Sequence, residues 1–143
     1  MLGNLSTVIK NYSMRELIKD KRRLEHILDA IDRVLNNTDG MVHDDLHKND
    51  LLYFGIVKCI EIIGEAAYRL TKRFRDSHPE TPWDYIIKMR HVLVHDYYQI
   101  DDEDIWIVIE DDLKPLKEQI VRYIDQTDWI EWENLESEQN PTT

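Results

Sequence analysis

Residues 50–75, DLLYFGIVKCIEIIGEAAYRLTKRFR, decide the fold that we expect of this chain. Apolar side chains recur around most of a helix drawn through this stretch, which predicts a central helix buried against several partners. Two glycines, Gly55 and Gly64, each weaken a helix by about 1 kcal/mol relative to alanine. Their presence predicts the close approach of a neighbouring backbone, and the small Ala66 and Ala67 extend that surface.

One helix is expected before the central helix in the chain, and another after it. Apolar residues recur at helical intervals from about Ser13, which can cap the first helix, and a turn-rich cluster at 36–40 ends it. The string Thr81-Pro82-Trp83-Asp84 is typical of a helix start, with threonine as the cap and an acid three residues later. A second helix is therefore expected from Pro82 to about Val94.

The last helix is expected to open at the acidic residues 101–104, which suit the positive end of its dipole. Its apolar stripe continues past Pro115, which lacks an N–H and should kink or split the helix there. Strand-like alternation is scarce, and short polar stretches separate the helices. The sequence therefore predicts an all-α fold, an antiparallel up-and-down bundle of four main helices, with the last helix kinked or split near Pro115.

At 143 residues the chain is long enough to bury a core, and we expect one helical domain over residues 1–127. Residues 1–12 are weakly patterned, which predicts a mobile arm or a short extra helix. Residues 128–143 hold five acids and no Lys or Arg. This composition predicts a flexible acidic tail, unless Trp129 and Trp132 dock on the body or on a partner.

The net charge of −11 argues against general affinity for a polyanion. Residues 69–90 depart from this balance, with six Lys or Arg against three acids. A nucleic-acid site would therefore have to be local and narrow. The single Cys59 cannot form an internal disulfide, and the sequence shows neither a signal peptide nor a membrane-spanning run, so we expect a cytoplasmic protein.

Residues 88–98, KMRHVLVHDYY, bring phosphate-binding and proton-transfer side chains together. Arg90 presents a planar cationic fork suited to phosphate, and His95 is suited to acid–base work near neutral pH. Five residues apart, the two would point about 140° away from each other on an ideal helix. Either the helix ends near Val94 and the chain turns His95 back, or a second copy of the motif completes the site.

Two histidine pairs are also candidates for metal binding. His91 and His95 would share a helix face, but no neighbouring acid or cysteine completes a coordination sphere. His43 and His47 are four apart with two aspartates between them, and they would share a face if that connection were helical. The simpler interpretation of this second pair is two surface histidines in a loop.

Two polar residues interrupt the apolar surfaces of the predicted helices. Glu65 in the central helix needs a partner if it is buried, and Arg90 is the candidate; otherwise its carboxylate reaches solvent. His26 in the first helix is interpreted as a structural or solvated residue.

The motif string resembles the R-x4-H-x-Y signature of HepT-like toxins, ribonucleases of the HEPN superfamily, with Arg90, His95 and Tyr97 at the three named positions. The similarity covers about residues 20–125. His91 departs from the pattern, because asparagine commonly follows the arginine in this family. Similar pieces occur in the same order along the chain: LEHILDAI at 24–31, IGEAA at 63–67, TPW at 81–83, Trp106 and DLKPLK at 112–117.

This resemblance implies a metal-independent endoribonuclease without a cofactor, which acts as the toxin of a toxin–antitoxin pair. The resemblance also implies that the protein is a homodimer, in which the motifs of both copies line one cleft, with Arg90 and His95 as the catalytic residues. The resemblance further implies an MntA-type minimal nucleotidyltransferase as antitoxin, which transfers AMP to Tyr97.

Supporting roles are assigned to His91 and Glu65, and the basic segment offers Lys88 and Arg73 as candidate RNA-binding residues. A different class of function stays open: a non-catalytic helical module that presents its cleft to a nucleotidyltransferase or a nucleotide. The acidic balance of the chain favours that alternative, whereas the intact set of motif residues favours the nuclease.

Overall fold

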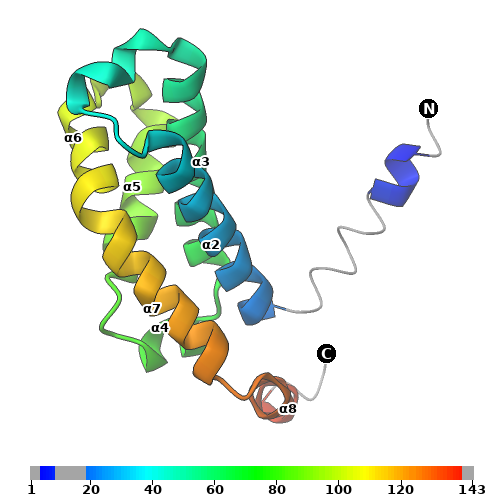
Figure 1. Ribbon diagram of the computed structural model, residues 1–143. Coiled ribbons are helices and arrows are strands. Elements are labelled where there is room, and N and C mark those ends of the chain that lie inside the picture. The colour runs from blue at the N-terminus through cyan, green and yellow to red at the C-terminus, as the bar shows by residue number, and fades with distance from the viewer. Residues whose placement is uncertain (1–3, 9–18, 140–143) are drawn as a thin grey trace.

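The computed structural model describes residues 4–8 and 19–139, and these ranges contain helices and no strand. The expected all-α antiparallel bundle is confirmed, and Figure 1 shows its long helices side by side and alternating in direction. The start expected near Ser13 lies outside the described residues, as does most of the expected arm at 1–12. The long elements are α2 (Lys19–Thr38), α3 (Asp50–Arg69), α5 (Trp83–His95) and a last run of α6 (Asp102–Ile107), η3 (Val108–Asp112) and α7 (Leu113–Gln126).

The central position expected of residues 50–75 belongs to α3, which packs against both α2 and α5, while α7 packs against α2. A fully buried aliphatic side chain stabilises the fold by roughly 1.5–3 kcal/mol. Helices α2, α3 and α7 each supply several, and α5 supplies Leu93. The apolar residues that meet in this core include Leu24, Ile27, Ile31, Ile56, Ile60, Ile63, Leu113, Leu116 and Ile120.

One stripe of α3 is not covered by the rest of the described chain, although burial around most of this helix was expected. Leu51 is 85% exposed, Phe54 54% and Ile62 38%. None of the described helices combines the length and the apolar character that a membrane span requires.

The connection before α3 forms a short 3-10 helix, η1 (His43–Lys48), and Asn49 then caps α3 by accepting a hydrogen bond from the Leu52 amide. Gly40 precedes this connection with a φ of 75°, a left-handed conformation that glycine adopts without strain. Helix α2 thus ends at Thr38, inside the cluster at 36–40 that was predicted to end it, and the turn itself is Asp39 and Gly40.

The prediction of one continuous helix from 50 to 75 is wrong, because α3 ends at Arg69 and a separate helix, α4 (Lys72–Ser77), follows. Thr71 caps α4 by accepting from the Phe74 amide at 3.1 Å. The buried Asp20 of α2 accepts two hydrogen bonds from Thr71, at 2.8 Å from its amide and 2.7 Å from its hydroxyl. This distant carboxylate stabilises the break, and local helical periodicity does not reveal it.

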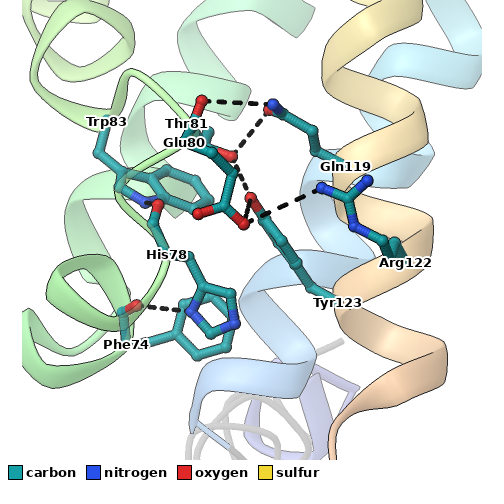
Figure 2. A network of polar contacts seen from close by, with 8 residues as sticks. All are labelled: Phe74, His78, Glu80, Thr81, Trp83, Gln119, Arg122 and Tyr123. Atoms are coloured by element: carbon teal, nitrogen blue, oxygen red, sulfur yellow. Dashed lines mark hydrogen bonds and ion pairs between the residues drawn. The ribbon is translucent and has the colours of Figure 1, made fainter.

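Thr81 does not cap α5, contrary to the sequence prediction, and the residue before the helix is Pro82. The Thr81 hydroxyl instead donates to Gln119 at 2.8 Å and lies 2.5 Å from the Tyr123 hydroxyl. Tyr123 in turn donates to Glu80 at 2.9 Å. Figure 2 shows this polar network between the start of α5 and α7, so Thr81 joins two helices rather than capping one.

The expected irregularity near Pro115 takes the form of a π-helical turn, η3, between α6 and α7. The Leu113 amide donates to the Val108 carbonyl, five residues back, instead of the usual four. Pro115 follows in the first turn of α7, where its missing N–H costs least. The wider turn therefore lets the last helix run accommodate the proline.

Residues 129–139 form an additional helix, α8 (Trp129–Gln139), in the region expected to be a flexible tail. Its tryptophans dock on the body: Trp132 donates to Asp20 at 2.9 Å, and Trp129 stacks on Phe74 with ring centroids 6.0 Å apart. Arg73 of α4 lies 3.5 Å from the centroid of the Trp132 ring and donates to the Trp132 carbonyl. Of the outcomes considered for these tryptophans, docking on the body is the one observed.

The close approach predicted from the two glycines occurs at Gly64 and not at Gly55. A Cβ at Gly64 would overlap Cβ of Arg90 and lie 3.0 Å from both Arg90 Cγ and the Ile86 carbonyl. A Cβ at Gly55 would meet nothing within 4 Å. Gly64 is therefore the position at which α5 packs directly on the backbone of α3.

We expect Gly64→Ala to lower the free energy of unfolding by about 1–3 kcal/mol or more, because the added methyl group must push α5 away from α3. Urea denaturation followed by circular dichroism measures this change. Gly55→Ala is the matched control, since it adds the same methyl group to the same helix in open space. It should raise the free energy of unfolding by about 0.5–1 kcal/mol. Equal effects at both positions would contradict the packing described at Gly64.

Candidate active site

The site begins with Arg90, whose side chain extends from α5 toward α3. Its Nη2 lies 3.0 Å from Oε2 of Glu65, and Oε1 of the same carboxylate accepts a hydrogen bond from Arg69 Nε at 2.8 Å. The sequence left open whether Glu65 pairs with Arg90 or reaches solvent; it pairs, while its side chain remains 36% exposed. Glu65 thus holds two guanidinium groups side by side.

Electrostatics keeps this carboxylate ionised. The hydrogen bond from Arg69 holds the pKa of Glu65 below its ordinary value, and the positive charges of Arg90 and Arg69 act in the same direction. Partial burial opposes the shift but does not reverse it. The Glu65 side chain is therefore charged at neutral pH and orients Arg90 through an ion pair.

Arg90 lines a groove between α2, α3 and α5, with a volume of about 380 Å³. We call it the α2–α3–α5 groove. Four permanent cations meet two carboxylates in its walls, so the groove is locally positive in a chain with a net charge of −11. The residues lining it are Arg23, His26, Lys58, Glu61, Ile62, Glu65, Ala66, Arg69, Arg90 and Val94.

His95 does not line this groove. Helix α5 continues through His95. The alternative in which the helix ends near Val94 and the chain turns His95 back toward Arg90 is therefore not observed. The ring of His95 contacts that of His91, with centroids 4.5 Å apart and the ring planes inclined by 51°, as expected for two residues four apart on one face. Arg90 and His95 therefore lie on different sides of α5 within one chain.

The other predicted site residues occupy separate places. Tyr97 begins the 3-10 turn η2 (Tyr97–Gln99), directly after α5. Lys88 is exposed on α5, whereas Arg73 contacts Trp132 of α8 and does not line the groove of Arg90.

The candidate metal pair at His43 and His47 has other contacts. His43 stacks on Trp106 with centroids 6.0 Å apart, and His47 pairs with Asp102 and stacks on Tyr53. The described part of the chain contains no group of three or more His, Cys, Asp or Glu side chains placed to hold a metal ion. Both histidines thus hold η1 against α6 and α3.

His26 is a residue that sequence reasoning set aside and that the structure places in the α2–α3–α5 groove, together with Arg90. Burial lowers its pKa below the ordinary value, and the charges of Arg22 and Arg23 lower it further. The imidazole is therefore neutral near pH 7 and offers both a donor and an acceptor. Arg23 and Lys58, which also line the groove, lie outside the basic segment at 69–90: Arg23 belongs to the basic run KDKRR at 19–23, which was not singled out, and Lys58 has no basic neighbour in the sequence.

Comparisons with known proteins bear on this site. Residues 27–123 match the family model described as "Ribonuclease HepT-like". A protein of Caldanaerobacter subterraneus subsp. tengcongensis named "Putative RNase" is 35% identical over 97 residues, which cover 68% of this chain and 87% of that protein. A "Probable ribonuclease HepT" of Thermococcus cleftensis is 32% identical over 97 residues, 68% of this chain and 88% of that one.

A longer relative from Methanocaldococcus jannaschii, named "Gamma-glutamylcyclotransferase and putative RNase", is 32% identical over 105 residues. The match covers 73% of this chain but only 47% of that protein, so this chain spans about half of its length. No solved structure matches the chain. The family model covers most of the chain, including both α3 and the Arg90 motif on α5, and the chain belongs to the HepT-like ribonuclease family.

Proposed function

We propose that this protein is a metal-independent endoribonuclease and the toxin of a toxin–antitoxin pair. The observation that carries the proposal is the position of Arg90: Glu65 orients it in a positive groove, on the same helix as His95, in a chain of the HepT-like ribonuclease family. A guanidinium held in this way needs little reorganisation to bind a phosphate.

The chemistry follows from these groups. The 2′-hydroxyl of RNA attacks the adjacent phosphorus, and the 5′-oxygen of the next nucleotide leaves, which produces a 2′,3′-cyclic phosphate. His95 serves as general base or general acid for the proton transfers, and Arg90 stabilises the charge that develops on the phosphoryl oxygens. No step needs a metal ion.

A second copy of the chain completes the site in this proposal. Arg90 and His95 lie on different sides of one α5, so an Arg90 from one copy meets a His95 from the other in a symmetric dimer. Leu51 and Phe54 of α3, which are 85% and 54% exposed and do not line the groove, support an interface on that part of α3.

Tyr97 is the control point in this proposal. It lies two residues beyond His95, at the start of the turn that follows α5. An MntA-type nucleotidyltransferase transfers AMP to its hydroxyl, and the added phosphate brings negative charge to the place that the RNA phosphate needs. The modified protein no longer cleaves RNA.

The first test concerns catalysis. Arg90→Ala and His95→Ala should each lower RNA cleavage by at least about 100-fold, because each removes a group that acts in the transition state. Arg90→Lys keeps the charge and most of the packing on Gly64 but loses the planar fork, so it should also be strongly impaired. Cleavage assays with chelator, and analysis of the product ends, measure the outcome.

Circular dichroism of each variant should match the wild type, which separates loss of a catalytic group from loss of fold. Activity that disappears with chelator and returns with a divalent metal would contradict the mechanism. Intact RNA under all conditions would favour the non-catalytic binding module.

The second test concerns the shared site. Arg90→Ala and His95→Ala are each inactive, but a mixed dimer of the two retains one complete pair, with Arg90 and His95 supplied by different copies. After subunit exchange at equal concentrations, activity should recover to about a quarter of the wild type, since half of the dimers are mixed and each has one of two sites. No recovery, with mixed dimers demonstrated by affinity tags, would place both residues of a site in one copy.

The third test concerns control by AMP. Co-expression with a cognate nucleotidyltransferase should yield an AMP adduct on Tyr97 and an inactive nuclease, as measured by peptide mass spectrometry and cleavage assays. Tyr98, which is 80% exposed, is the matched control. Tyr98→Phe should still be modified and inhibited, whereas Tyr97→Phe should escape modification. Full inhibition with an unmodified Tyr97 would mean that the partner acts by occlusion.

A further inference from the structure

The α2–α3–α5 groove contains more cations than the motif supplies. Of its four permanent cations, only Arg90 belongs to the motif; Arg23 comes from α2, and Lys58 and Arg69 come from α3. Three helices therefore direct positive charge into one groove of about 380 Å³. Like charges repel, and bringing them together favours the binding of an anion that neutralises them.

Glu65 holds two of these cations together. Its carboxylate binds Arg69 at 2.8 Å and Arg90 at 3.0 Å, so the two guanidinium groups lie side by side in the groove wall. A guanidinium has five N–H donors, and the ion pair orients Arg90 while leaving donors for a ligand. Lys58 lies further along α3 and is 69% exposed.

Apolar side chains line the groove as well. Ile62 is 38% exposed and Val94 45%, and Ala66 lies with them in the lining. A surface that combines cations with apolar side chains suits a single nucleic-acid strand, whose phosphates bind the cations and whose sugars and bases cover the apolar area.

We propose that the α2–α3–α5 groove is a track for single-stranded RNA, in which Arg23, Lys58 and Arg69 bind the phosphates next to the one that Arg90 engages. This inference rests on the ribonuclease function proposed above and adds to it the residues that hold the substrate outside the motif. The track explains how a chain with a net charge of −11 binds a polyanion: the contact is confined to one groove.

The experiment measures binding apart from cleavage. A fluorescent 2′-O-methyl RNA of about twelve nucleotides is long enough to fill one such groove and has no free 2′-hydroxyl to attack its backbone. Fluorescence anisotropy over a series of KCl concentrations gives the association constant of the wild-type dimer and of Lys58→Gln and Arg69→Gln.

Each variant should bind the probe at least about threefold more weakly at low salt. The slope of log K against log salt should become shallower by about 0.7 for each lost phosphate contact. Lys48→Gln is the matched control, because Lys48 is 73% exposed and pairs with an acid three residues away, as Lys58 does, but lies in η1 outside the groove. It should leave both quantities unchanged.

Unchanged affinity and slope in both groove variants would overturn the track even if the wild type cleaves RNA. An equal loss in Lys48→Gln would also overturn it, because the effect would then reflect general charge. In a third outcome, the wild type binds the probe and the groove variants bind it more weakly, but unmodified RNA stays intact. That outcome would support the track and refute the ribonuclease. Because Lys58 is largely exposed, Lys58→Gln tests the track without disturbing the fold.

Discussion

The approach of α5 to α3 at Gly64 is the contact on which both the bundle and its candidate site depend. The Arg90 stem occupies the space that a side chain at position 64 would fill, and the neighbouring residue, Glu65, takes the Arg90 guanidinium at 3.0 Å. The glycine costs helix stability, and direct packing between two helices offsets that cost. Gly64 sets the spacing of α3 and α5, and the adjacent Glu65 orients Arg90. The packing of the fold therefore also determines the electrostatics of the groove.

A buried carboxylate organises the part of the molecule where α3 ends and α4 begins. Asp20 is 3% exposed, and it accepts hydrogen bonds from the Thr71 amide, the Thr71 hydroxyl and the indole of Trp132. These bonds satisfy a group that would otherwise be costly to bury. They also fix the break between α3 and α4 and the docking of α8. Arg73 is thereby engaged with Trp132, so the basic segment at 69–90 divides between a structural contact and the groove.

The fold class could be predicted from sequence because helical periodicity is a local property. Arg90 could be named as the candidate partner of Glu65, but only the structure decides between that pair and a solvent-exposed carboxylate. The break at Thr71 and the role of Thr81 could not be predicted, because each depends on a partner far along the chain: Asp20 for the first, Gln119 and Tyr123 for the second. The positive groove was missed for the same reason. Arg23 and Lys58 are far from each other and from Arg90 in the sequence, and only the packing of α2 and α5 on α3 brings them together.

The π-helical turn at Val108–Asp112 has a consequence for the rotational register of the last helix run. Such a turn holds one residue more than a regular helix would need to span the same length. A chain one residue shorter here would continue as a regular helix, but α6 would rotate by about 100° relative to α7. Trp106 and Asp102 would then turn away from His43 and His47, which they contact now. The extra residue in this wide turn thus lets α6 and α7 each keep their own set of contacts.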